Sequence, residues 1–320
     1  MKRLTAVVLA LLLSGCGLPG GAPPSAALQR VVIISVDGLR PDLLQGAEAP
    51  RMQALLHSGT YTLRAETMAQ PDTLPCHVSM LTGVSPAKHG VTWNRYIEQS
   101  YPEVPTLFEL AKQAGLTTAM AAGKMKFIAL AKPKTLDDVF IPPTEPVADS
   151  VVAGQAARML VDRRPHVLFV HLAGVDAVGH DKGWGSPEQL LAIGDADRAV
   201  GTVLDALQKS DLTRSTLVIL TADHGGVGQA HGGDDPQVRS VPWIASGPGV
   251  REGFDLAATP ESAVHLADTF ATACAWLGIK SGGVCEGKPV LEVLRGSPPP
   301  VGVSAGNGAA AGSKANGSGG

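Results

Sequence analysis

Three runs of apolar residues constrain the fold of this 320-residue chain more than any other feature. They cover residues 31–36, 166–172 and 216–220, and Val, Ile, Leu and Phe dominate them. Continuous runs of this kind predict strands buried on both faces, which are typical of parallel sheets covered by helices. Because the carboxyl ends of parallel strands lie along one edge of a sheet, polar groups that follow them are expected to meet there. An acidic residue follows each run within four positions: Asp37, Asp176 and Asp223.

The segments between these runs predict further helices and strands. Predicted helices cover residues 49–59, 105–115, 149–163, 186–209 and 261–277, and predicted strands cover 60–67, 117–122 and 241–246. A hydrophobic content of 44% suits one large domain with a well-buried core. We therefore expect an α/β fold over residues 31–296, a three-layer sandwich around a mostly parallel, doubly wound sheet.

The N-terminus has the features of an export signal. Lys2 and Arg3 precede a short apolar run, Leu4–Leu13, which is too short to span a bilayer. Leu13–Cys16 resembles the bacterial lipobox, in which the Cys is lipidated, and the alternative is an ordinary signal peptide. We expect an exported lipoprotein on the periplasmic side of the cell envelope, at the outer membrane if the host is Gram-negative.

The chain ends are expected to be flexible. Residues 17–30, rich in Gly, Pro and Ala, would tether the lipid anchor at Cys16 to the fold. Residues 297–320 consist mainly of Gly, Ala, Ser, Pro and Asn and are predicted to be disordered.

Charge and cysteine content exclude some functions. The formal net charge is −3, and removal of a signal peptide that carries Lys2 and Arg3 makes it more negative. Binding to a nucleic-acid polymer needs clustered basic residues and is not expected. No Cys-x-x-Cys motif occurs, so a thiolate zinc site is not expected, and pairing of Cys274 with Cys285 stays open.

Three imidazoles accompany the three carboxylates. His180 follows Asp176 by four positions, and His224 directly follows Asp223 in Thr221–Gly226, from which a glycine-rich segment leads to His231. Each Asp alone could be a turn or helix-capping residue. Together the six side chains suit a divalent cation that accepts carboxylate and imidazole ligands.

Thr73 adds a hydroxyl to this set. Pro75 favours the first turn of a helix, so Thr73 is expected at a helix N-terminus, where backbone N–H groups favour an anion; the alternative is a simple capping residue. Seven ligands are too many for one tetrahedral ion, whereas two ions about 3.5–4 Å apart would use them and suit displacement at phosphorus. No Gly-x-Ser-x-Gly motif or Ser-His-Asp set offers another nucleophile, which favours Thr73.

From Val31 to about Val293 the chain resembles the alkaline phosphatase superfamily and, within it, the nucleotide pyrophosphatase/phosphodiesterase branch. The resemblance is carried by ordered motifs at Asp37–Pro41, Thr73–Gly83, His89–Asn94, Asp176–His180, Thr221–Gly225, His231–Gly232 and Pro242–Pro248. It implies an alkaline-phosphatase-like fold and hydrolysis of small phosphoric esters by a type I phosphodiesterase reaction.

The resemblance also implies roles for individual residues. One zinc ion would be held by Asp37, Thr73, Asp223 and His224, and a second by Asp176, His180 and His231. Thr73 would form a covalent phospho-enzyme intermediate, and the amide of Asn94 would donate to a non-bridging phosphoryl oxygen.

Departures from related patterns leave alternatives open. Sulfatases of the superfamily have Cys or Ser followed by Pro and Arg, where this chain has Thr73, Pro75 and His77, which disfavours sulfatase activity. Phosphomonoesterase or phosphonate hydrolase activity, phospho-group transfer between lipids, and a surface-anchored binding protein with an inactive site remain alternatives. Candidates to line the substrate pocket, or else to serve only in packing, are Trp93, Lys124 and Trp184. The other six histidines, including His77 and His89, are interpreted as structural.

Overall fold

The structure is a computed structural model that describes residues 29–258 and 263–294. The predicted signal peptide with Cys16, almost all of the tether and the predicted C-terminal tail lie outside the described residues. Within the described ranges, no helix is both long and apolar enough to cross a membrane.

One eight-stranded sheet organises the molecule. Its strand order is β4-β3-β5-β1-β6-β7-β2-β8. The strands are β1 (Arg30–Val36), β2 (Thr60–Glu66), β3 (Thr118–Ala122), β4 (Asp138–Phe140), β5 (Val167–Leu172), β6 (Thr216–Thr221), β7 (Ser240–Ser246) and β8 (Phe254–Asp255). Neighbouring strands from β4 to β6 are parallel, and β7 alone runs antiparallel to its neighbours. This arrangement confirms the expected mostly parallel α/β sheet.

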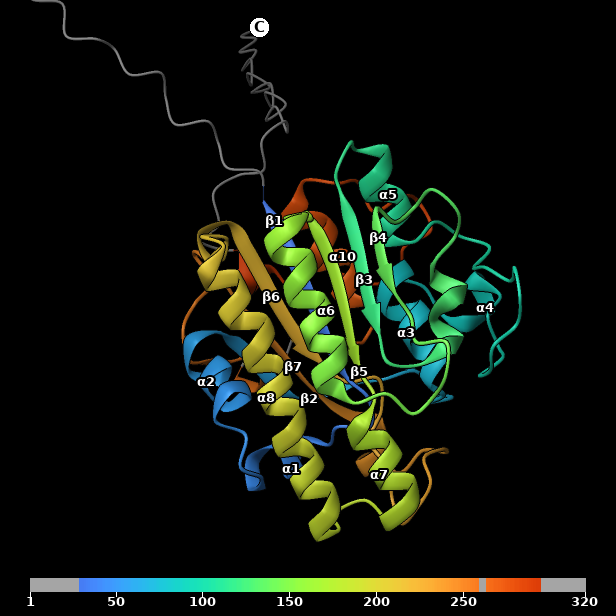
Figure 1. Cartoon of the computed structure of the whole chain (residues 1–320), viewed down its shortest axis with the longest axis vertical. Coiled ribbons are helices and arrows are strands. Elements are labelled where there is room, and N and C mark those ends of the chain that lie inside the picture. Colours follow the sequence, from blue (N-terminus) through green and yellow to red (C-terminus); the bar gives the residue numbers. More distant parts are fainter. Residues whose placement is uncertain (1–28, 259–262, 295–320) are drawn as a thin grey trace, which may run out of the picture.

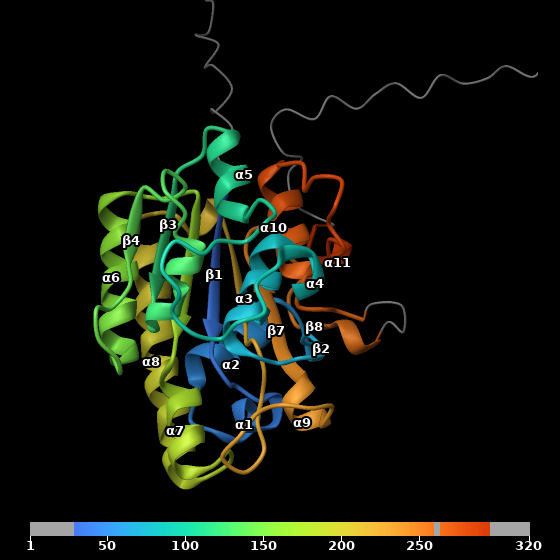
Figure 2. The ribbon, with the colours of Figure 1, turned by 90° about the vertical axis from the view of Figure 1, so that its right-hand side faces the viewer.

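Helices cover both faces of the sheet, as Figures 1 and 2 show. On one face lie α2 (Pro50–Ser58), α6 (Asp149–Asp162) and α8 (Pro187–Lys209), and on the other lie α3 (Thr73–Thr82), α4 (Pro86–His89) and α10 (Asp268–Leu277). The remaining helices are α1 (Pro41–Gly46), α5 (Leu107–Gln113), α7 (Gly174–Lys182), α9 (Pro236–Arg239), α11 (Leu291–Leu294) and the 3₁₀ segments η1 (Met125–Leu130), η2 (Thr213–Ser215) and η3 (Leu256–Ala258).

The three central strands end at the same level. Val36 of β1 pairs with Leu172 of β5, and Ser35 of β1 pairs with Thr221 of β6. All three strands are buried along almost their whole length, which explains their continuous apolar runs. Residues that follow these strands therefore emerge side by side at one edge of the sheet.

The prediction of a C-terminal helix from residue 261 was wrong about where it begins. The α10 helix begins at Asp268, because the preceding residues pair with β2: the Leu266 N–H donates to the Glu66 carbonyl, and the Glu66 N–H donates to the Val264 carbonyl. Helical residues could not make these sheet contacts. The cysteines of the described residues, Cys76, Cys274 and Cys285, are free thiols, so Cys274 and Cys285 are not paired.

Candidate metal centre

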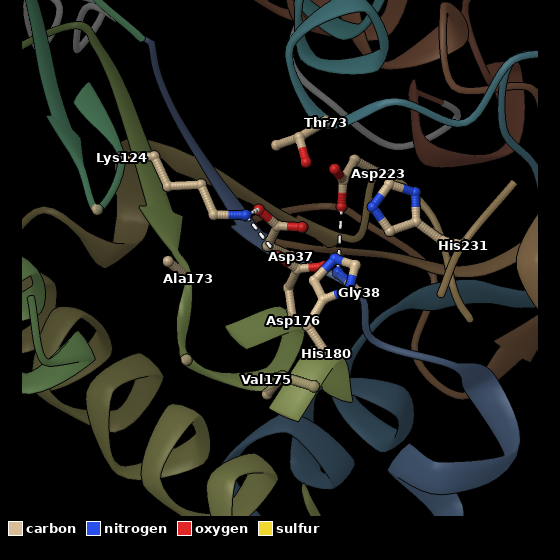
Figure 3. A network of polar contacts seen from close by, with 12 residues as sticks. Asp37, Gly38, Thr73, Lys124, Ala173, Val175, Asp176, His180, Asp223 and His231 are labelled. Carbon is tan, nitrogen blue, oxygen red and sulfur yellow. Dashed lines mark hydrogen bonds and ion pairs between the residues drawn. The ribbon is translucent and has the colours of Figure 1, made fainter. Parts of the chain in front are cut away.

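Six side chains form two groups at the carboxyl edge of the sheet (Figure 3). The first group follows β1 and β6, and the second comes from α7, which follows β5, and from the loop after β6. Within each group the candidate ligand atoms lie within 4.8 Å of one another. The first group consists of Asp37, Asp223 and His224, and the second of Asp176, His180 and His231.

Burial differs between the two groups. Every side chain of the first group is fully buried. In the second group Asp176 is buried, His231 is half-buried, and the side chain of His180 is 45% exposed. The first group therefore lies in the interior and the second faces solvent.

In each aspartate, one carboxylate oxygen accepts hydrogen bonds from protein groups and the other does not. Asp37 Oδ2 accepts from Lys124 Nζ (2.6 Å) and His171 Nε2 (2.9 Å). Asp176 Oδ2 also accepts from Lys124 Nζ (2.6 Å), and Asp223 Oδ1 accepts from the Gly38 N–H (3.2 Å). The second oxygen of each carboxylate is buried without a hydrogen-bond partner. A buried, unpartnered carboxylate oxygen is costly, so three of them together fit a site for cations.

The unpartnered oxygens face imidazole nitrogens. His224 Nε2 lies 3.5 Å from Asp37 Oδ1 and 3.2 Å from Asp223 Oδ2. In the other group His180 Nε2 lies 3.4 Å from Asp176 Oδ1. Nitrogen and oxygen ligands at this spacing could both bind one ion placed between them.

Hydrogen bonds at Nδ1 prepare all three imidazoles to bind a metal. Nδ1 of His180 is 3.0 Å from the Gln229 carbonyl, Nδ1 of His224 is 2.9 Å from the Gly225 carbonyl, and Nδ1 of His231 is 2.8 Å from the Pro71 carbonyl. A carbonyl oxygen only accepts, so each Nδ1 carries the proton. The lone pair of each Nε2 is therefore free for a metal, which is the arrangement usual for histidine ligands.

The electrostatics of the buried group also fit a cation. Burial, and then the charge of Asp37, raise the pKa of Asp223 well above its usual value. Burial raises the pKa of Asp37 too, but Lys124 and His171 outweigh it and hold that pKa well below the usual value. Burial lowers the pKa of His224 to about 4, so its imidazole is neutral at physiological pH. Without a metal ion, the negative charge of Asp37 therefore disfavours ionisation of Asp223. A divalent ion between the two carboxyl groups would favour the ionised form of both.

Thr73 lies next to the buried group, as its first place in α3 predicts. Its Oγ1 is 3.5 Å from His224 Nε2, and its side chain is buried. The positive end of the α3 helix dipole lies at the same point. The structure thus brings a hydroxyl, the N-terminus of a ten-residue helix and a cation site together.

Asn94 is held at the same helix end. Its Oδ1 accepts from the Leu74 N–H (3.1 Å) and from Lys126 Nζ (2.9 Å), which identifies the other amide atom as Nδ2. Nδ2 lies 3.4 Å from Asp72 Oδ1, a long hydrogen bond. This amide group is therefore oriented by its neighbours, with its donor close to the residue before Thr73.

The three pocket candidates have different surroundings. Lys124 contacts the carboxylates of Asp37 and Asp176. Trp184 is buried, donates from Nε1 to the Gly38 carbonyl (2.8 Å) and covers Gly226, where a Cβ would lie 2.3 Å from the indole ring. Trp93 is half-buried and packs against the hydrophobic core.

Sequence reasoning missed two histidines that contact the site. His171 bonds to Asp37, and His77 Nδ1 lies 2.7 Å from the Thr73 carbonyl and 3.5 Å from Asp223 Oδ2. His171 is a polar residue at the end of the otherwise apolar strand β5, and this signal could have identified it. His89 at the end of α4 is buried and its Nε2 lies 3.0 Å from Ser79 Oγ of α3, away from the candidate ligands.

Comparisons with known proteins identify a family. Residues 31–235 match the family model of type I phosphodiesterase / nucleotide pyrophosphatase. Ectonucleotide pyrophosphatase/phosphodiesterase family member 1 from Homo sapiens is 26% identical over 216 residues, which are 61% of this chain and 23% of that protein. The bis(5'-adenosyl)-triphosphatase of the same family from Bos taurus is 26% identical over 245 residues, or 70% of this chain and 53% of that protein.

A solved structure shares the fold of this chain. Murine ectonucleotide pyrophosphatase/phosphodiesterase 5, solved as an inactive threonine-to-alanine variant in complex with AMP, superposes with a TM-score of 0.69 at 15% identity. The superposition covers 83% of this chain and 99% of that one, and it confirms the expected alkaline-phosphatase-like fold. The chain spans about a quarter to a half of the length of the curated relatives. Because the family model covers well over half of the chain, this protein belongs to the type I phosphodiesterase / nucleotide pyrophosphatase family.

Proposed function

We propose that this protein is a metal-dependent phosphoric ester hydrolase that attacks small phosphodiesters with the Thr73 hydroxyl. The observation that carries the proposal is the set of three buried, unpartnered carboxylate oxygens beside the metal-ready Nε2 atoms, with Thr73 Oγ1 adjacent. In a cluster with a purely structural role, buried carboxylate oxygens would be expected to have hydrogen-bond partners.

Two divalent ions, for which zinc suits the mixed nitrogen and oxygen ligands, are proposed as cofactors. Asp37, Thr73, Asp223 and His224 would hold one, and Asp176, His180 and His231 the other. When bound, the ions would lower the pKa of the hydroxyl and neutralise charge on the leaving group.

The residues of the chain then have separate tasks. Thr73 Oγ1 loses its proton to solvent and attacks phosphorus. The bond from phosphorus to the leaving oxygen breaks as the ester to Thr73 forms, and the leaving oxygen takes up a proton from solvent and departs as the alcohol. Asn94 Nδ2 donates to a non-bridging phosphoryl oxygen, and the N-terminus of α3 favours the same negative charge. Water then cleaves the phosphothreonine bond, which releases the phosphate monoester and restores the Thr73 hydroxyl.

The substitution Thr73→Ala tests the nucleophile. We expect it to lower hydrolysis of an aryl phosphodiester at least about 10³-fold, because the covalent step is lost. Zinc content should stay largely intact, because Asp37, Asp223 and His224 still hold the ion. Thr82→Ala, at the other end of α3, is the matched control and should keep both activity and zinc. Substantial turnover by Thr73→Ala would contradict the covalent role.

Substrate preference separates the remaining alternatives. The wild-type protein should be assayed with aryl phosphodiester, phosphomonoester and phosphonate substrates, after chelation and after zinc is added back. We expect the zinc-restored protein to prefer the diester. A preference for the monoester or phosphonate would select that alternative, and zinc binding without any turnover would indicate a binding protein.

We also propose that the chain is an exported lipoprotein anchored through Cys16, as its N-terminal motif indicates. Mass spectrometry of the protein isolated from membranes should find a lipid-modified N-terminus at Cys16. Cys16→Ser should release the protein from the membrane fraction, and an unmodified chain that still sediments with membranes would refute the anchor.

A further inference from the structure

Lys124 lies between the two groups of candidate metal ligands. Its Nζ is 2.6 Å from Asp37 Oδ2 in one group and 2.6 Å from Asp176 Oδ2 in the other, and its side chain is 12% exposed (Figure 3). Asp37 and Asp176 are 139 positions apart in the chain and follow neighbouring strands, β1 and β5. One ammonium group therefore joins the two halves of the centre.

The contacts of Lys124 leave the metal-binding oxygens free. It bonds to the Oδ2 atoms, whereas the unpartnered atoms that face His224 and His180 are the Oδ1 atoms. A lysine on one oxygen and a cation on the other is compatible with monodentate carboxylate binding. Lys124 is thus placed to orient the carboxylates without occupying the places of the ions.

The surrounding backbone determines where Lys124 lies. It follows Gly123, whose N–H donates to the His171 carbonyl and to His171 Nδ1, so the end of β3 is bonded to the end of β5. A Cβ on Gly123 would lie 3.1 Å from the Ala173 Cβ. Because His171 Nδ1 accepts here, its Nε2 carries the proton that is donated to Asp37. His171 and Lys124 thus bind the same carboxylate oxygen from two sides.

The charges of the centre explain why such a cation is needed. Three carboxylates lie within it, and Asp37 and Asp223 are fully buried. Lys124 Nζ lies 2.6 Å from a carboxylate oxygen of both Asp37 and Asp176. Before metal ions bind, an ammonium group in contact with two of these carboxylates offsets the repulsion between them.

We propose that Lys124 is a positioning residue: a built-in cation that links Asp37 to Asp176 and keeps both metal-ligand groups formed in the metal-free protein. Zinc ions then enter a site that already has its geometry. The inference rests on the proposed two-metal function, and it assigns Lys124 a role other than binding substrate.

The test compares metal-free and zinc-loaded proteins. In Lys124→Met we expect the melting temperature of the chelated protein to fall by about 5–10 °C, because two buried carboxylates lose their counter-ion. With zinc bound, the fall should be less than about 2 °C, because the ions then offset the same repulsion. Lys124→Arg, which keeps the charge, should recover at least half of the loss. Lys132→Met, which breaks an exposed ion pair of 2.7 Å with Glu109, is the matched control and should change neither value.

Each outcome decides the proposal. If the melting temperature of Lys124→Met falls equally with and without zinc, or falls in neither state, the role of Lys124 is overturned. The proposed metal centre would still stand in that case, provided that the wild type binds two zinc ions. A wild-type protein that binds no zinc would refute the metal centre and the inference together. If Lys124→Met is unfolded after chelation, recovery of its circular dichroism spectrum on adding zinc supports the proposal, and failure to recover counts against it. Unchanged melting temperatures with a raised KM for a phosphodiester would instead assign Lys124 to substrate binding.

Discussion

At the scale of residues, the centre depends on how single atoms are shared. Each carboxylate gives one oxygen to protein donors and leaves the other unpartnered, and each imidazole gives Nδ1 to a backbone carbonyl. The donors come from distant segments: Lys124 follows β3, and Gly38 follows β1. The proposed metal ligands are therefore oriented by residues that would not themselves bind the ions.

His180 allows a direct test of one metal position. Its side chain is 45% exposed, so His180→Ala should change the free energy of unfolding of the metal-free protein by less than about 1 kcal/mol. Loss of this ligand should lower the zinc content from two ions to one and reduce phosphodiester hydrolysis at least about 10²-fold. Elemental analysis after dialysis against limiting zinc measures the first effect. The exposed residue His57 provides the control substitution His57→Ala, and two tightly held zinc ions in His180→Ala would contradict this ligand assignment.

At the scale of elements, helix α6 orients helix α7. No side chain at the N-cap of α7, Ala173, accepts a hydrogen bond from the helix, but Asp149 at the start of α6 accepts from the N–H groups of Ala173 (2.8 Å) and Gly174 (3.1 Å). A Cβ on residue 174 would lie 2.8 Å from Asp149 Oδ2, so a larger residue there would displace the Asp149 carboxylate from this contact. Because α7 carries Asp176 and His180, this contact between helices positions one metal-ligand group.

Asp149 also makes a prediction about pH. Burial raises its pKa to about 6, against 3.8 for an unperturbed carboxyl group. The folded state thus binds the proton more tightly than the unfolded state, and the contribution of Asp149 to stability falls as the pH rises from about 4 to about 6. Asp149→Asn keeps an acceptor without the charge. Relative to the wild type, it should gain about 2–3 kcal/mol in free energy of unfolding between pH 4 and pH 7.

Urea unfolding of the chelated protein at both pH values measures this change. Asp149→Ala removes the acceptor and should lower the free energy of unfolding by about 1–2 kcal/mol at pH 4. At this pH, Asp149 of the folded wild type is protonated and carries no charge. A difference between Asp149→Asn and the wild type that stays constant with pH would show that Asp149 does not titrate in this range.

Two glycines shape the loop that returns His231 to the site. A Cβ on Gly225 would lie 2.0 Å from the Gln237 carbonyl oxygen, and one on Gly226 would lie 2.3 Å from the Trp184 ring. The loop therefore packs directly against the start of α9 and against Trp184. This close approach lets an imidazole seven residues after His224 stack on the His224 ring, with ring centroids 3.8 Å apart.

At the scale of the whole molecule, the two metal-ligand groups connect segments that are far apart in the chain. They join the ends of β1 and β6, the helix after β5, and the loop after β6. Bound ions would therefore stabilise the sheet edge as a unit, because the unfolded chain does not hold these ligands together.

Removal of metal should be visible in the unfolding of the entire domain. With each ion at about 100 times its dissociation constant, binding adds about 2.7 kcal/mol per site, so chelation should lower the melting temperature by about 5 °C or more. Calorimetry before and after chelation measures the shift. Zinc should restore the original value and magnesium should not, because imidazole ligands suit zinc. A melting temperature unaffected by chelation would contradict a two-metal centre.

The amino-acid sequence by itself determined the buried strands, the parallel sheet and the six side chains at its carboxyl edge. These features depend on local patterns: apolar runs define the strands, and the chemistry of Asp and His defines the possible ligands. The tertiary structure alone decided which carboxylate oxygen is free, that Lys124 and His171 bond to Asp37, that Asp149 holds α7, and that α10 begins at Asp268 instead of residue 261. These outcomes depend on contacts between residues that are distant in the chain, and such contacts exist only after the sheet has aligned its strands.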